Sequence, residues 1–306
     1  MSWRLEEGPF VCYNLRMQTY LDCYPCILRQ SIEAVRMAGG TSAQERAVVQ
    51  KVLETLKNIP DSATPPAIGM KVHQLVREIT ANPDPYASVK KAGTEKALSL
   101  LPELTALVAE SEDRLETALR LSIAGNIIDF GPHPQYDLWN EIERVLVQEP
   151  AINDLPILRE CLETADSILL LGDNAGETVF DRILIEALPK PVTYVVRGGP
   201  ILNDAAYEDA IAAGIETVAE VIDTGARVPG VYLSLCSDAF RQRFEAAQLI
   251  LAKGMGNYES LSEVAAPIFF LLQVKCPVVA RDLDAEVGSI IIKQGDQFRV
   301  SESYRV

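Results

Sequence analysis

The first half of the chain has apolar residues at the spacing of amphipathic helices. Between residues 20 and 37 the apolar positions recur at this spacing, and Gly39-Gly40 ends the segment. The same periodicity predicts further helices from Thr41-Ser42 toward Leu56 and over residues 69–80, 87–101, 104–124 and 136–147. Two polar loops, at 82–86 and 125–131, interrupt the series. We therefore predict a mainly helical domain over residues 1–150.

The second half changes to short apolar runs that alternate with helical patterns. The runs lie at 167–171, 192–196, 216–221, 231–235, 249–252 and 268–274. Bounded runs of this kind, separated by helices, are typical of βαβ units with a buried, mostly parallel sheet. We therefore predict an α/β domain over residues 151–306.

Polar residues collect where these predicted strands end. Five runs are followed by charged or amide residues together with small ones, in the segments 172–177, 197–204, 236–238, 253–259 and 275–276. In an open parallel sheet, ligands bind beyond the carboxyl ends of the strands. One polar strand end is expected in any sheet, but five in one sheet indicate a functional site at this edge.

Three of these segments offer groups for phosphate chemistry. Asp173 and Asn174 supply oxygen ligands that suit a hard cation such as Mg²⁺ or Mn²⁺. Arg197, suited to phosphate oxygens, precedes Asp204, and Lys253 stands on a glycine-flanked turn. Each segment also has a simpler interpretation as a helix cap. Asp173 or Asn174 would cap a helix starting near Glu177, Asn203 or Asp204 a helix over 205–213, and Asp238 a helix over 239–247.

Charge and composition exclude several classes of function. The net charge is −15 and the sequence pI is near 4.7, with no basic stripe, so nucleic acid is not an expected partner. An acidic protein that handles phosphates needs a local positive charge, such as a bound cation. The longest apolar run, residues 265–274, is too short to cross a bilayer, and residues 1–10 lack an apolar signal core. We expect a cytoplasmic protein without a membrane partner.

The histidines and cysteines give weaker indications. His73 and His133 are too few and too far apart for a histidine-rich metal site, and we assign neither to catalysis. Cys23 and Cys26 have the spacing that lets two thiolates bind one metal, although a structural zinc site needs four ligands. The alternative is that they are two thiols at the start of a helix.

The motifs together resemble the damage-control phosphatase family, which was long catalogued as a domain of unknown function. The resemblance is carried by the segments Gly172-Asp173-Asn174-Ala175-Gly176-Glu177, Arg197-Gly198-Gly199-Pro200-Ile201-Leu202-Asn203-Asp204 and Lys253-Gly254-Met255-Gly256-Asn257-Tyr258-Glu259. The loops at 82–86 and 125–131 and the Cys23–Cys26 pair resemble its prokaryotic CxxC-containing subfamily. The resemblance covers residues 20–276.

This resemblance implies a helical N-terminal domain followed by a Rossmann-like three-layer α/β/α sandwich. It implies a divalent metal, Mg²⁺, Mn²⁺, Co²⁺ or Ni²⁺, on Asp173, Asn174 and Asp204, with Lys253 near the phosphate. Asn126, Asp129, Glu177, Arg197 and Asn257 are then candidates for the substrate-binding side. Cys276 and Cys12 are possible partners of Cys23 and Cys26 in a second metal site. The implied activity is hydrolysis of small phosphorylated metabolites, either sugar phosphates or damaged phosphometabolites.

Several alternatives stay open at the level of sequence. The nucleophile is either a water near Asp173 or Asp204, or one of these aspartates. A nucleotide-binding transferase is disfavoured because no GxxxxGK[ST] segment occurs. A non-catalytic sensor of a phosphometabolite or of a metal would carry the same ligands.

Overall fold

A seven-stranded sheet forms the centre of the molecule. The computed structural model describes residues 17–60, 63–127 and 138–298. The strands are β1 (Ile152–Asn153), β2 (Ile168–Leu171), β3 (Val192–Val196), β4 (Glu220–Asp223), β5 (Ile250–Lys253), β6 (Ile268–Gln273) and β7 (Ile290–Gln294). Their order in the sheet is β1-β7-β6-β5-β2-β3-β4, and every neighbouring pair is parallel except β6–β7. The predicted, mostly parallel sheet is confirmed.

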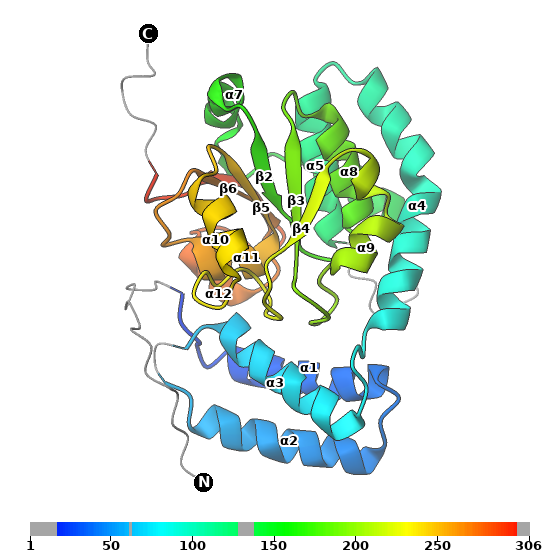
Figure 1. Ribbon diagram of the computed structural model, residues 1–306, viewed down its shortest axis with the longest axis vertical. Helices are drawn as coiled ribbons and strands as arrows, with labels where there is room; N and C mark the ends of the chain where they lie inside the picture. Colours follow the sequence, from blue (N-terminus) through cyan, green and yellow to red (C-terminus); the bar gives the residue numbers. More distant parts are fainter. Residues whose placement is uncertain (1–16, 61–62, 128–137, 299–306) are drawn as a thin grey trace.

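Helices precede the sheet and then alternate with its strands (Figure 1). The first six are α1 (Cys23–Met37), α2 (Ser42–Lys57), α3 (Pro65–Thr80), α4 (Ala87–Glu110), α5 (Arg114–Ile127) and α6 (Leu138–Val147). The others are α7 (Leu155–Thr164), α8 (Thr178–Ala187), α9 (Tyr207–Ala212), α10 (Asp238–Glu245), α11 (Gly254–Leu261) and α12 (Pro277–Asp282), with a 3₁₀ turn, η1 (Ile215–Thr217).

The two faces of the sheet bury separate apolar cores. Strand β2 shows the division: Ile168 and Leu170 belong to one core, whereas Leu169 and Leu171 belong to the other. Successive side chains of a strand point to opposite faces, so a central strand that is apolar throughout feeds both cores. Helices α4–α9 contribute to the first core, and α1–α3 and α10–α12 to the second. The predicted Rossmann-like three-layer arrangement is confirmed.

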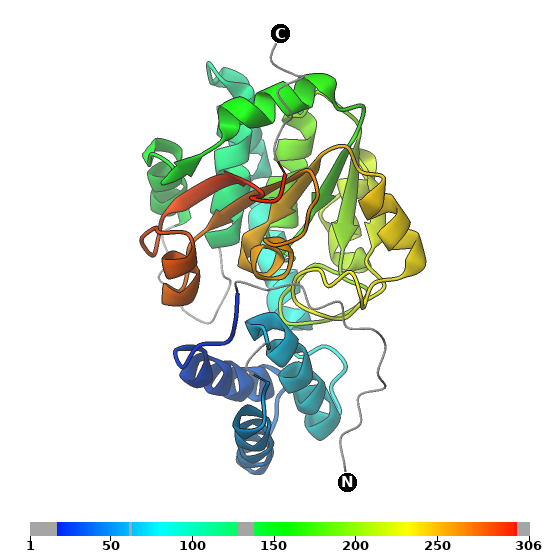
Figure 2. The same cartoon turned by 90° about the vertical axis from the view of Figure 1, so that its left-hand side faces the viewer.

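Helices α1–α3 form a layer beyond one end of the strands (Figures 1 and 2). The Arg77 side chain of α3 donates to the Pro200 carbonyl in the loop that follows β3, at 3.4 Å. This contact places the layer at the carboxyl edge of the sheet, where the sequence predicts the site. Helices α4–α6 share a core with α8 instead. The domain boundary at residue 150 stays a prediction.

The elements differ from the sequence predictions in four places. Residues 231–235 form turns rather than a strand, because Val231 N bonds to Ser260 Oγ at 2.9 Å instead of to a neighbouring strand. Pro102 lies inside α4, and the break falls at 111–113, where Asp113 Oδ1 accepts from Glu116 N and starts α5. Strands β1 and β7 had no predicted counterpart. Helix α3 begins at Pro65, four residues before the predicted start at 69, since the first helical turn needs no N–H bond from proline.

Candidate functional site

The loops after β2 and β3 bring the three predicted ligands, Asp173, Asn174 and Asp204, together. Asn174 and Asp204 form an isolated antiparallel bridge. Ala205 N donates to Asp173 O at 2.8 Å, and Ala175 N donates to Asn203 O at 2.9 Å. Because β2 and β3 are neighbours in the sheet, these loops leave it side by side and can bond to one another.

The cap interpretations of these residues are not observed. Helix α8 begins after Glu177 and α9 after Ala206, and neither Asp173, Asn174 nor Asp204 caps them. At α10 the capping side chain is Ser237, which accepts from Phe240 N, and not Asp238. The polar groups after β2 and β3 are therefore not explained by helix termination.

Each of the three ligand candidates has one polar group engaged by the protein. Asp173 Oδ2 accepts from Asn126 Nδ2 at 2.7 Å and from Asn174 Nδ2 at 3.1 Å. Asn174 Nδ2 also donates to Glu177 Oε2 at 3.1 Å, and Asp204 Oδ2 accepts from Arg197 Nε at 2.7 Å. These bonds fix the orientation of all three side chains.

The remaining oxygen of each candidate accepts no hydrogen bond from the described residues. These atoms are Asp173 Oδ1, Asn174 Oδ1 and Asp204 Oδ1; the nearest charge to the first is Arg197 Nη2 at 3.6 Å. Two carboxylate oxygens and one amide oxygen form a hard donor set that fits Mg²⁺ or Mn²⁺. The residues present therefore fit the divalent metal that the sequence predicts.

Arg197 has unused donors at this site. Its side chain is 1% exposed, Nε is bonded to Asp204, and the buried Nη1 and Nη2 have no hydrogen-bond partner within the described chain. Buried polar groups without partners are uncommon and costly, so unused guanidinium donors here suggest a ligand that accepts them. Phosphoryl oxygens are suitable acceptors.

Lys253, by contrast, has all three ammonium protons engaged. Nζ donates to Ser122 O at 2.9 Å, to Glu177 Oε1 at 2.5 Å and to Asp181 Oδ1 at 2.6 Å, and the side chain is fully buried. A direct contact with phosphate would require one of these bonds to be given up. Sequence reasoning missed Asp181, although its position four residues after Glu177 on one helix was a usable signal.

Gly254 and Asn257 pack closely around the ends of β2 and β5. Gly254 has φ +73°, and a Cβ there would lie 1.9 Å from Asp173 Oδ2. Asn257 Nδ2 donates to the carbonyls of Gly172 and Lys253 at 3.1 and 2.8 Å, while its buried Oδ1 has no partner in the described chain. Asp129, the last predicted site residue, lies outside the described residues.

Carboxylates crowd this site. Burial and the charges of Asp204 and Glu177 raise the pKa of Asp173 to about 8, against the opposing charges of Arg197 and Lys275. Burial raises the pKa of Asp204 as well, although Arg197 opposes the shift. The pKa of Glu259 is raised to about 8 by burial and by Asp173. A cation bound among these groups would relieve their mutual repulsion.

The cysteines lie on elements that face the same edge. Cys23 begins α1, and Cys276 is the N-cap of α12. Burial is the main cause of the raised pKa of both thiols, and the charge of Glu259 contributes to each. Across residues 17–60, 63–127 and 138–298, no three His, Cys, Asp or Glu side chains are arranged to hold a metal ion. A second metal on Cys23, Cys26 and Cys276 stays a prediction, and Cys12 lies outside the described residues.

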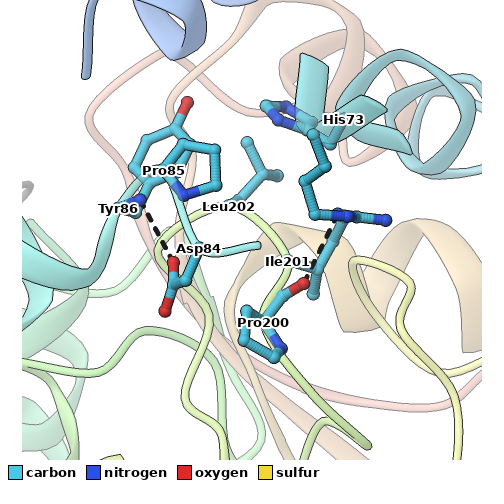
Figure 3. A pocket seen from close by; sticks show the side chains of 8 residues that line it. His73, Asp84, Pro85, Tyr86, Pro200, Ile201 and Leu202 are labelled. Atoms are coloured by element: carbon cyan, nitrogen blue, oxygen red, sulfur yellow. Dashed lines mark hydrogen bonds between the residues drawn. The ribbon is translucent and has the colours of Figure 1, made fainter. Parts of the chain in front are cut away.

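The seam between α3 and the site loop is closely packed (Figure 3). His73 and Tyr86 of the helical part face Pro200–Leu202, and the hollow between them leaves no room for a water molecule. His73 packs edge-on against Tyr86 at 5.8 Å between ring centroids, and its buried ring nitrogens have no partner in the described chain. Burial lowers its pKa to about 3, which keeps the imidazole neutral. The seam is a packed contact between the helical part and the loop that follows β3.

In the described part of the chain, no helix has the length and apolar character needed to cross a membrane.

Comparisons with known proteins show which family the chain resembles. The model of the damage-control phosphatase ARMT1-like domain matches residues 19–291. A protein of Pyrococcus horikoshii named damage-control phosphatase is 36% identical over 285 residues, which cover 90% of this chain and 97% of that protein. A damage-control phosphatase of Archaeoglobus fulgidus is 35% identical over 284 residues, or 89% and 97% of the two chains.

A solved structure is similar along nearly the whole chain. The crystal structure of a DUF89 family protein from Pyrococcus horikoshii matches with a TM-score of 0.82 and 34% identity, covering 92% of this chain and all of that one. With a family model that spans most of the sequence and relatives above 30% identity, the chain belongs to the damage-control phosphatase ARMT1-like (DUF89) family.

Proposed function

We propose that this protein is a divalent-metal-dependent phosphomonoester hydrolase that acts on small phosphorylated metabolites, either sugar phosphates or damaged phosphometabolites. The observation that carries the proposal is one oxygen each on Asp173, Asn174 and Asp204, and the two terminal nitrogens of Arg197, that have no hydrogen-bond partner among the residues the structure describes. The same set would not be needed to terminate helices or to fill a core.

In this proposal the site residues have separate roles in phosphoryl transfer. Asp173, Asn174 and Asp204 would hold Mg²⁺, Mn²⁺, Co²⁺ or Ni²⁺, which when bound would offset negative charge on the transferring phosphoryl group. Arg197 donates to phosphoryl oxygens through Nη1 and Nη2 while its Nε keeps Asp204 in place. The attacking group is a water held near Asp173 or Asp204, or the free oxygen of one aspartate.

The other predicted site residues support this arrangement. Asn126 and Glu177 bond to the ligand candidates, so in this proposal they shape the metal end of the site. Asn257 joins the ends of β2 and β5, and Asp129 is proposed for the substrate side. A direct Lys253–phosphate contact, membership of the CxxC-containing subfamily and a cysteine metal site remain proposals.

Phosphate release from metal-stripped protein tests the proposed function. A panel of sugar phosphates and nucleotides is assayed with each divalent cation restored, using wild type, Asp173→Ala and the control Asp238→Ala. Asp238 is an exposed aspartate, with 82% of its side chain accessible, outside the ligand set. We expect metal-dependent release that vanishes in Asp173→Ala and persists in Asp238→Ala. Tight metal binding without release from any compound would favour a non-catalytic metal or phosphometabolite sensor instead.

A further inference from the structure

A hydrogen-bonded chain of buried side chains lies behind the site. Asp181 of α8 accepts from Tyr194 Oη at 2.7 Å through Oδ2, and from Lys253 Nζ at 2.6 Å and Ser122 Oγ at 2.7 Å through Oδ1. Lys253 Nζ also donates to Glu177 Oε1 at 2.5 Å. All five side chains are fully buried. Four elements, α5, α8, β3 and β5, are tied together at this point.

This hydrogen-bonded chain of side chains connects to the ligand candidates through the side-chain amides of Asn126 and Asn174. Glu177 Oε2 accepts from Asn126 Nδ2 at 2.7 Å and from Asn174 Nδ2 at 3.1 Å. The same two NH₂ groups donate to Asp173 Oδ2. A carboxylate such as Glu177 accepts hydrogen bonds and donates none, so the Asn174 amide presents its NH₂ to Glu177 Oε2 and its Oδ1 away from it. Glu177 thereby sets which end of Asn174 is available to a metal.

The far end of the chain also abuts the backbone of the ligand loop. A Cβ on Gly172, the residue before Asp173, would lie 2.4 Å from Tyr194 Oη. The Tyr194 hydroxyl that donates to Asp181 therefore occupies the space that a side chain at this position would need. The position of Asp181 is coupled to the ligand loop from two sides.

We propose that Asp181 is a positioning residue of the metal site: it holds Lys253, Lys253 holds Glu177, and Glu177 orients the Asn174 amide. In this proposal Asp181 is not a metal ligand, because both of its oxygens already accept hydrogen bonds, from Ser122, Tyr194 and Lys253. Lys253 is held between the carboxylates of Glu177 and Asp181. If Asp181 loses its charge, Glu177 is the one carboxylate left to Lys253, and neither side chain is held in place as firmly. The inference rests on the proposed function only in assuming that Asp173, Asn174 and Asp204 bind a divalent metal.

Calorimetric titration of metal-stripped protein with Mn²⁺ tests this role without an activity assay. In Asp181→Asn the side chain keeps its shape, its Oδ1 can still accept from Lys253, and its amide can donate to the Tyr194 oxygen. We expect Mn²⁺ to bind about 10- to 100-fold more weakly than in wild type, the range found for residues that orient metal ligands. Tyr194→Phe keeps the charge and should show a smaller loss.

A matched control separates positioning from general destabilisation. Glu116→Gln on α5 likewise neutralises a carboxylate partner of a buried cation, because Arg120 Nη2 donates to Glu116 Oε1 at 2.8 Å, and it leaves the hydrogen-bonded chain that includes Asp181 unchanged. It should lower the melting temperature and leave Mn²⁺ affinity unchanged. If Asp181→Asn folds poorly, the double variant Ser122→Ala with Tyr194→Phe removes both neutral donors to Asp181 and should weaken Mn²⁺ binding several-fold.

The outcomes are distinguishable. Wild-type Mn²⁺ affinity in Asp181→Asn, or in the double variant where the single one does not fold, would overturn the positioning role and leave the phosphatase proposal standing. Phosphate release by a wild-type protein that binds no divalent metal would overturn the metal part of the proposed function and this inference with it.

Discussion

Substitution of Gly254 by alanine tests whether the site depends on the close approach of α11 to Asp173. The added Cβ would lie 1.9 Å from Asp173 Oδ2 and 2.4 Å from its Cγ. Contacts below 3.0 Å are not tolerated, so either the carboxylate or the start of α11 must move by more than 1 Å. The carboxylate cannot move freely, because Asn126 and Asn174 both donate to the same oxygen.

Two effects add in this variant and have separate magnitudes. The φ of +73° is unfavourable for a residue with a Cβ and costs about 1–2 kcal/mol of folding free energy. In a chain of this size that cost lowers the melting temperature by about 2–4 °C per kcal/mol. Displacement of a catalytic group by about 1 Å can cost roughly 100-fold in rate, and we expect a loss of at least this size in kcat/KM.

Gly39 provides a matched control. Its φ is also +73°, but a Cβ there would have nothing within 4 Å. Gly39→Ala therefore carries the backbone cost without the clash. It should lose a similar amount of thermal stability from φ alone and keep wild-type Mn²⁺ affinity and turnover.

Thermal melts, Mn²⁺ titration and phosphate release from one sugar phosphate are measured on both variants. We expect Gly254→Ala to lose metal affinity and turnover far beyond Gly39→Ala. If the two variants are equally stable and equally active, the approach of Gly254 to Asp173 does not position the site and the reasoning is refuted.

Three further predictions follow from charge and burial. Because the pKa of Asp173 is raised to about 8, Mn²⁺ binding at pH 7 should release a proton, and Mn²⁺ affinity should rise by up to about tenfold per pH unit until pH 8. Calorimetry in buffers of different ionisation enthalpy counts the released protons, and binding without proton release would contradict the raised pKa. Arg197→Met removes the ion-pair partner of the buried Asp204 carboxylate and should lower the free energy of unfolding by about 3–5 kcal/mol, measured in urea without metal. Adding Asp204→Asn should restore part of this stability, and no recovery would argue against a stabilising Arg197–Asp204 ion pair. The pKa of His73 is about 3 in the fold against an ordinary 6.5, so the free energy of unfolding should fall by up to about 5 kcal/mol as the pH drops from 6.5 toward 3. In urea unfolding, His73→Phe should lose less stability over this pH range, and an equal loss would exclude His73 as the cause.

The sequence predicted the elements that depend on local patterns. Apolar spacing located most of the helices, and short apolar runs located β2, β3, β5 and β6 to within a few residues. Burial on one face gives a helix a regular apolar spacing, and burial on both faces makes a strand apolar throughout. The predictions were wrong where partners from elsewhere decide the structure. The apolar run after Val231 looks like a strand, but its backbone bonds to a serine on α11.

The sequence also indicated an edge of the sheet as the candidate site and named residues whose oxygens suit a metal. Parallel strands present their carboxyl ends at one edge, so Asp173, Asn174 and Asp204 could be expected together before any coordinates were known. Their oxygen chemistry, and the resemblance of their segments to a phosphatase family, indicated the same type of reaction.

Only the tertiary structure decided which donors and acceptors of these groups remain available to a ligand. Within residues 17–60, 63–127 and 138–298, it showed one oxygen on each ligand candidate and two nitrogens on Arg197 without a hydrogen-bond partner, whereas Lys253 has three acceptors for its ammonium group. It also showed that Asp181 accepts hydrogen bonds from Tyr194 and Lys253, contacts that only the meeting of α8, β3 and β5 creates. The physical reason is that a hydrogen bond is settled by which elements meet in space. A pattern along the chain records the period of one element but not the neighbours that will use its polar groups.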